Sequence, residues 1–135
     1  AGIAKIFLCG YTAHPPRPEI TKTALGAEES VPWEAVDDPA KAVTLLKREG
    51  IPVYVLEQTT AGRSLWEAPL RLPMGLVVGN EVEGVTPHIV ALADGALEIP
   101  LHGRKESLNV AVACGIALFE VSRRARRAGR LFGAI

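Results

Sequence analysis

The chain alternates short apolar runs with longer segments in which apolar residues recur at helical spacing. A short apolar run that ends at glycine or at polar residues is the pattern of a buried strand. Four such runs predict strands at residues 5–9, 51–56, 75–78 and 96–101. Strands that alternate with helices are typical of an α/β protein. We therefore predict a single-domain fold with a mostly parallel sheet flanked by helices.

Capping residues mark the predicted helices. Residues 38–50 begin with Asp-Pro and end with Gly, and residues 86–95 begin with Thr-Pro and also end with Gly, so both are predicted as helices. The last predicted helix covers about residues 107–127. Residues 110–121 are apolar on nearly every side of this helix, which predicts that they are buried.

The segments that follow the strands are the expected place for chemistry. In open parallel sheets, ligands bind beyond the carboxyl ends of the strands. Those ends are expected at Gly10 and at residues 57–59, 79–81 and 100–102. The second of these opens a long connection to residue 73, and long loops are often functional.

Composition narrows the classes of function. The 135 residues are 48% hydrophobic and 22% charged, as expected for a globular protein rather than a disordered one. Fifteen basic and fifteen acidic residues cancel, which excludes a generally basic nucleic-acid binder but not a local basic patch. No apolar run reaches the ~18 residues of a membrane span. Two cysteines inside apolar runs, without a signal-peptide pattern before them, predict free thiols in a cytoplasmic protein.

Two polar segments beyond strands carry candidate chemistry. Residues 79–84 read Gly-Asn-Glu-Val-Glu-Gly, in which glycine permits a ligand to approach the backbone and a carboxylate accepts hydrogen bonds. A plain turn with solvated acids explains the same residues. Residues 106–109, Glu-Ser-Leu-Asn, open the last helix. A helix cap explains either the serine or the asparagine, but it explains less well why two polar residues flank the leucine. Histidines and cysteines lack the spacing of metal ligands, so no metal site is predicted.

The end of the last predicted helix is basic. Its five arginines within eight residues are Arg123, Arg124, Arg126, Arg127 and Arg130. Cations stabilise the negative end of a helix dipole, so a solvated helix end is one interpretation. A local phosphate-binding patch is the other.

Two blocks together resemble motifs of the SpoU (TrmH-like) RNA ribose 2′-O-methyltransferases. Residues 76–85, Leu-Val-Val-Gly-Asn-Glu-Val-Glu-Gly-Val, resemble the second motif of that family. Residues 99–101, Ile-Pro-Leu, followed by residues 106–113, Glu-Ser-Leu-Asn-Val-Ala-Val-Ala, resemble the third motif. The resemblance covers nearly the whole chain, so residues 1–135 are identified as a SpoU-type methyltransferase domain.

The resemblance implies a fold and a cofactor. The fold is the SPOUT fold, whose C-terminal segment forms a trefoil knot, and the cofactor is S-adenosylmethionine bound in that knot. Gly79, Ile99 and Leu108 would line the cofactor pocket, with Leu108 packed on the adenine ring. Main-chain groups around Ile99 and Leu101 would hydrogen-bond the adenine, and Thr59 would belong to another wall.

The resemblance also implies a reaction and its partners. The family methylates a ribose 2′-oxygen of tRNA or rRNA, needs no metal and generally works as a homodimer. Asn109 and Ser107 would orient the substrate or a catalytic arginine, and Glu81 would do the same or contact the sulfonium side of the cofactor. Phosphates of RNA are expected at Arg104, Lys105, Arg126 and Arg127.

The first motif of the family, Asn-x-Gly-x-x-x-Arg-Thr-Ala, is not found in these residues. Its arginine is usually assigned to activating the ribose hydroxyl. The opening residues 1–6, Ala-Gly-Ile-Ala-Lys-Ile, look like the stretch just after that motif, so the domain is expected to be N-terminally incomplete. A cofactor- or RNA-binding SPOUT module without catalysis is therefore the alternative function.

Overall fold

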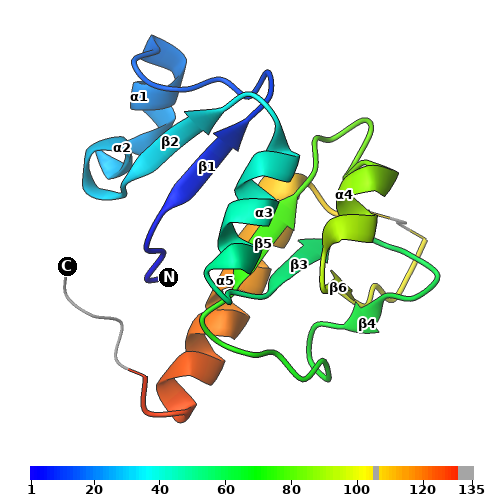
Figure 1. Ribbon diagram of the computed structural model, residues 1–135. Coiled ribbons are helices and arrows are strands. Elements are labelled where there is room, and N and C mark those ends of the chain that lie inside the picture. Colours follow the sequence, from blue (N-terminus) through cyan, green and yellow to red (C-terminus); the bar gives the residue numbers. More distant parts are fainter. Residues whose placement is uncertain (105–106, 131–135) are drawn as a thin grey trace. The chain divides into compact units, whose positions relative to one another are not determined.

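The computed structural model describes residues 1–104 and 107–130 and contains two compact units. One unit runs from Gly2 to Ala42, and the other contains the chain from Val43 onward together with Ala1. Figure 1 shows the helices and strands of both. No helix among the described residues has the length and apolar character needed to cross a membrane.

The first unit is a parallel pair of strands joined through two short helices. The strands are β1 (Ile6–Cys9) and β2 (Trp33–Val36), and the helices are α1 (Pro18–Ala24) and α2 (Ala27–Ser30). Ile6 lies opposite Trp33 in the ladder, and Lys5 forms an exposed ion pair of 2.6 Å with Glu34. β1 confirms the strand predicted first, whereas β2 was not predicted. Its residues are mostly exposed, so they carry no apolar run.

The second unit is built on a four-stranded parallel sheet with the order β4-β6-β3-β5. Its strands are β3 (Val53–Leu56), β4 (Arg63–Ser64), β5 (Gly75–Val78) and β6 (Gly95–Glu98). β3 lies between two neighbours, with Val53 opposite Gly75 of β5 and Tyr54 opposite Gly95 of β6. β3, β5 and β6 confirm three of the predicted strands. The prediction of an α/β fold with parallel strands is thereby confirmed.

Three helices match the capping patterns of the sequence. They are α3 (Pro39–Arg48), α4 (Pro87–Leu92) and α5 (Val110–Arg127). Asp38 Oδ1 accepts a hydrogen bond of 2.9 Å from the main-chain nitrogen of Ala40, as its place before α3 predicts. α5 begins three residues later than predicted, because Asn109 rather than Ser107 is its N-cap.

Helices pack on both faces of the four-stranded sheet. Successive residues of a strand point to opposite faces. A Cβ on Gly75 of β5 would meet the side chains of Leu46 in α3 and Val53 in β3, which places α3 on the sheet face to which Val53 points. The other face carries the buried cluster of Leu65, Ala68, Leu97 and Ala117. Tyr54 packs against this cluster, and Ala117 belongs to α5, which lies behind the sheet in Figure 1.

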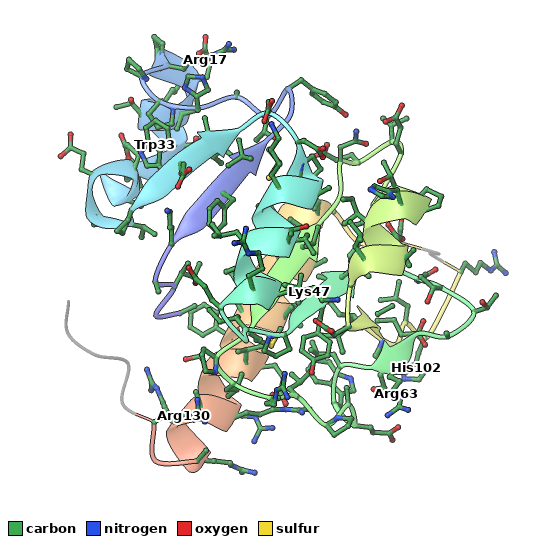
Figure 2. All side chains as sticks on the ribbon, in the orientation of Figure 1. Arg17, Trp33, Lys47, Arg63, His102 and Arg130 are labelled. Carbon is green, nitrogen blue, oxygen red and sulfur yellow. The ribbon has the colours of Figure 1, made fainter. Side chains whose placement is uncertain are left out.

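Lys47, labelled in Figure 2, ties α3 to the connection between α4 and β6. Its Nζ donates to the carbonyl oxygen of Leu92 at 2.7 Å and lies 3.3 Å from Asp94 Oδ1. The other oxygen of Asp94 accepts from the main-chain nitrogen of Val53 at 2.8 Å, and this hydrogen bond is the largest cause of the lowered pKa of Asp94. One carboxylate thus fixes the start of β3 to the start of β6.

The prediction that residues 110–121 are buried was wrong for much of α5. Within this stretch Ala117 and Glu120 are buried, but Val112 and Phe119 have exposed fractions of 52% and 66%. The physical reason is that only one side of α5 packs on the sheet, while the apolar residues of the helix extend around to its other side.

Candidate functional site

A pocket of about 150 Å³ lies where β3 and β6 end and α5 begins. Its apolar lining residues are Leu56, Leu97, Ile99, Leu101, Leu108 and Ala113, and its polar ones are Glu57, Gln58, Glu98 and Ser107. The pocket therefore lies at the carboxyl edge of the parallel sheet, which is the edge that the sequence predicts for ligand binding.

The structure brings together several residues that the resemblance assigns to the cofactor. Ile99, Leu101 and Leu108 all line the pocket and are half-buried, and Ser107 lines it as well. Among the described residues, Gly79 and Thr59 are not part of the lining. The carbonyl oxygen of Thr59 accepts a hydrogen bond of 3.1 Å from the nitrogen of Gly62, so Thr59 helps to shape the turn that follows β3.

The segment 79–85 after β5 is a tight turn that needs its glycines. Asn80 Oδ1 accepts from the main-chain nitrogens of Val82 at 2.8 Å and Glu83 at 2.6 Å. A Cβ on Gly79 would overlap with the main chain of Gly84, which itself has a φ of +65°. Turn geometry alone therefore explains both glycines, and the role of Gly79 beside the cofactor stays a prediction.

Glu57 links the end of β3 to this turn. Its Oε2 accepts a hydrogen bond of 2.9 Å from the main-chain nitrogen of Val85, and its Oε1 accepts one of 3.0 Å from Gln58. The sequence placed Glu57 in the loop after a strand, and the family resemblance placed that loop in a wall of the cofactor pocket, but neither gave the Glu57 carboxylate a role of its own. The available signal was its position, because it directly follows a strand of the sheet at the edge where ligands bind.

The three candidate catalytic residues occupy different places. Ser107 lines the pocket. Asn109 caps α5, because its Oδ1 accepts from the main-chain nitrogens of Ala111 at 3.0 Å and Val112 at 3.3 Å. Glu81 is exposed in the turn after β5. Capping accounts for the oxygen of Asn109, and the catalytic roles of all three residues stay predictions.

The basic end of α5 divides into two kinds of arginine. Arg124 Nε donates to Oε1 of the buried Glu120 at 2.8 Å, and its other nitrogens donate to the carbonyl oxygens of Leu65, Trp66 and Ala68. Arg123 donates twice to Glu120 at 2.7 Å. Arg124 therefore holds α5 to the segment after β4, whereas Arg123 pairs with Glu120 within the helix. This charged cluster lowers the pKa of Glu120 to about 2, with the hydrogen bond from Arg123 as the largest cause.

The arginines predicted to contact RNA are exposed. Arg126 and Arg127 lie in the last turn of α5, and Figure 2 shows Arg130 just beyond it. Arg104 is exposed in the loop before α5, and Lys105 lies outside the described residues. The rise of a helix places the two ends of α5 roughly 25 Å apart. Arg104 precedes the start of α5 in the sequence, and Arg126 and Arg127 lie at the other end of that helix.

The chain matches the family model described as "SpoU rRNA Methylase family" over residues 1–119. It is 33% identical over 128 residues to a tRNA (guanosine(18)-2′-O)-methyltransferase of Aquifex aeolicus. That match covers 94% of this chain and 61% of the relative. Its structure resembles that of a putative RNA methyltransferase of the TrmH family from Porphyromonas gingivalis, with a TM-score of 0.81 and 34% identity over 91% of this chain and 50% of the other. An AdoMet-bound rRNA methyltransferase from Sinorhizobium meliloti gives a TM-score of 0.82 and 26% identity, covering 90% of this chain and 46% of the other. The chain thus spans less than two thirds of each of these proteins.

Proposed function

The chain belongs to the SpoU rRNA methylase family, and on this premise we propose that it acts in the S-adenosylmethionine-dependent methylation of ribose 2′-oxygens in tRNA or rRNA. The observation that carries the proposal is the pocket at the carboxyl edge of the sheet. It unites Ile99 and Leu101, which follow β6, with Ser107 and Leu108, which precede α5. These are residues of the third motif, and they lie apart in the sequence but share one lining.

The lining residues suit S-adenosylmethionine. Leu56, Ile99 and Leu108 offer apolar side chains against which an adenine ring packs. Residues 99–101 follow the end of β6, so their main-chain groups are the expected partners for the polar edge of the ring. Glu57 and Glu98 add carboxylates to the same lining, and a carboxylate favours the positive charge that the sulfonium and amino groups of this cofactor carry.

The reaction needs alignment and removal of a proton. The bound cofactor supplies a methyl group on a positively charged sulfur. A ribose hydroxyl is a weak acid, so the protein must hold its oxygen in line with the methyl group and assist loss of its proton. Ser107 at the pocket and Asn109 at the start of α5 are proposed to orient the substrate or a catalytic arginine. Glu81, in the turn after β5, is proposed to do the same or to contact the sulfonium side of the cofactor. The proton acceptor is not assigned to any of these residues.

Assembly and topology form part of the same proposal. The trefoil knot and the homodimer are those of the family. The exposed apolar residues Val112 and Phe119 on α5 support the dimer, because a second copy would remove them from water. Arg104, Arg126 and Arg127 are proposed to contact phosphates of the RNA. Because the substrate is tRNA or rRNA, the proposed location is the cytoplasm.

The test is a map of 2′-O-methylated nucleotides in tRNA and rRNA from cells with and without the gene. The proposal predicts that at least one position loses its ribose methyl group when the gene is absent and regains it when the gene is restored. The control is restoration with the Leu108→Asp variant, which should not return the methyl group. An unchanged map in both classes of RNA would favour the non-catalytic SPOUT module.

A further inference from the structure

Glu57 occupies a position that none of the recognised motifs includes. It directly follows β3, a strand with neighbours on both sides in the sheet, and its own main-chain nitrogen donates to the carbonyl oxygen of Leu97 in β6 at 3.1 Å. Its side chain lines the pocket. The same side chain reaches across to the turn after β5, where it accepts the hydrogen bond from Val85. One residue therefore touches β6, the pocket and the turn that carries the second motif.

Both oxygens of the Glu57 carboxylate accept from main-chain nitrogens. Oε2 accepts a hydrogen bond of 2.9 Å from the main-chain nitrogen of Val85, and Oε1 accepts one of 3.0 Å from the main-chain nitrogen of Gln58. Hydrogen bonds to an ionised carboxylate are stronger than those between neutral groups. A glutamine at this position has one acceptor oxygen, and its NH₂ group would face the second N–H donor. A carboxylate therefore satisfies both donors, whereas a glutamine satisfies only one of them and without a charge.

Gly84 completes this arrangement from the side of the turn. A Cβ on Gly84 would overlap with Glu57 Oε2, and the φ of Gly84 is +65°, a conformation that favours glycine. Val85, the next residue, is 9% exposed, so its N–H has little access to water as a replacement acceptor. The hydrogen bond from Val85 to Glu57 is therefore the attachment that holds the end of the turn against β3.

We propose that Glu57 is a positioning residue for the cofactor, which holds the turn 79–85 beside the pocket so that the cofactor site is formed before the ligand arrives. This inference rests on the proposed function for the identity of the ligand. Without the carboxylate, the turn keeps its internal hydrogen bonds to Asn80 but loses its attachment to β3. Binding must then order the turn again, and affinity falls.

The test compares Glu57→Ala and Glu57→Gln with the control Glu83→Gln, which changes an exposed glutamate of the same turn. Hydrogen exchange of the Val85 amide is measured without ligand, and affinity for S-adenosylmethionine is measured by calorimetry. Both Glu57 variants should speed exchange at Val85 and weaken binding by about tenfold, the effect of losing one charge-assisted hydrogen bond. The control should match the wild type in both measurements. Glu57→Gln keeps the size of the side chain, so it tests the role of the carboxylate even if Glu57→Ala does not fold.

A third variant, Gly84→Ala, disturbs the same attachment from the side of the turn. Its Cβ would overlap with Glu57 Oε2, so the carboxylate and the turn must move apart, and the variant should weaken binding as the Glu57 variants do. Wild-type affinity in Gly84→Ala, or in either Glu57 variant, overturns the positioning role. Unchanged exchange at Val85 in the Glu57 variants overturns the attachment itself. Failure of the folded wild type to bind the cofactor would instead refute the proposed function, and the exchange data would still decide whether the attachment exists.

Discussion

Glu120 gives a prediction for the pH dependence of stability. Its side chain is 8% exposed and accepts hydrogen bonds from Arg123 at 2.7 Å and Arg124 at 2.8 Å. Arg123 is the largest cause of the fall in the pKa of Glu120 from 4.5 to about 2. A carboxyl whose pKa is lower in the folded chain than in the unfolded chain stabilises the folded form at neutral pH. That stabilisation is lost as the pH falls from about 4.5 through 2.

The size of the effect follows from the two pKa values. A pKa lowered from 4.5 to about 2 corresponds to a free energy of about 3 kcal/mol in favour of the folded form. Arg123 is itself 48% exposed, so water screens part of its interaction with Glu120. After this discount we expect about 2 kcal/mol.

The assay is urea unfolding of the wild type and of Glu120→Gln between pH 6.5 and pH 2.5. At pH 6.5 the variant should be less stable by about 2 kcal/mol, because the amide has lost the charge that pairs with two arginines. Towards pH 2.5 the difference should shrink to less than half, because the carboxyl of the unfolded wild-type chain, with a pKa near 4.5, is then protonated, which stabilises the unfolded form. Glu81→Gln, at an exposed position, is the control. A difference between wild type and Glu120→Gln that stays constant with pH would refute the argument.

Three further predictions concern the core, the cap and the basic surface. Leu97→Ala, at a residue 1% exposed, should lower the free energy of unfolding by about 3 kcal/mol in urea titrations. Asn109→Ala removes the cap of α5 and should lower it by about 1 kcal/mol in the same titrations. Replacing Arg126 and Arg127 by Ala should weaken RNA binding across sequences and reduce the salt slope by about 0.7 for each lost phosphate contact, with stability unchanged. Arg124→Ala should instead destabilise the fold. If the double variant of Arg126 and Arg127 binds RNA as tightly as the wild type, these two arginines do not contact phosphates.

Much of the fold was predictable because strands and helices leave local patterns. β3, β5 and β6 are short apolar runs, and α3 has an Asp-Pro start that the structure uses as a cap. β2 escaped prediction because Trp33 to Val36 is largely exposed, so its strand character comes from pairing with β1 and not from an apolar run. β4 has only two residues, too few for any periodic pattern.

The site was predictable only in part, and the reason is again physical. Ile99, Leu101 and Leu108 were found through motif resemblance and meet in the pocket. The role of Glu57 depends on the main-chain nitrogen of Val85, 28 residues away in the sequence, and no side-chain pattern records a main-chain donor across a sheet. The same holds for Arg124, whose partners include main-chain carbonyls of the segment after β4. Counting arginines cannot separate such a residue from one that is exposed.

The most direct test of the pocket as the cofactor site is calorimetric titration of S-adenosylmethionine into the protein and into Leu108→Asp. The wild type should show saturable binding with one cofactor for each pocket. The variant should show no binding, because an aspartate at position 108 places a charge against the apolar face of the adenine. Circular dichroism of both proteins establishes that they are folded. A folded wild-type protein that releases no heat and shows no binding at millimolar cofactor, or a Leu108→Asp variant that binds as well as the wild type, would contradict the assignment of this pocket to the cofactor.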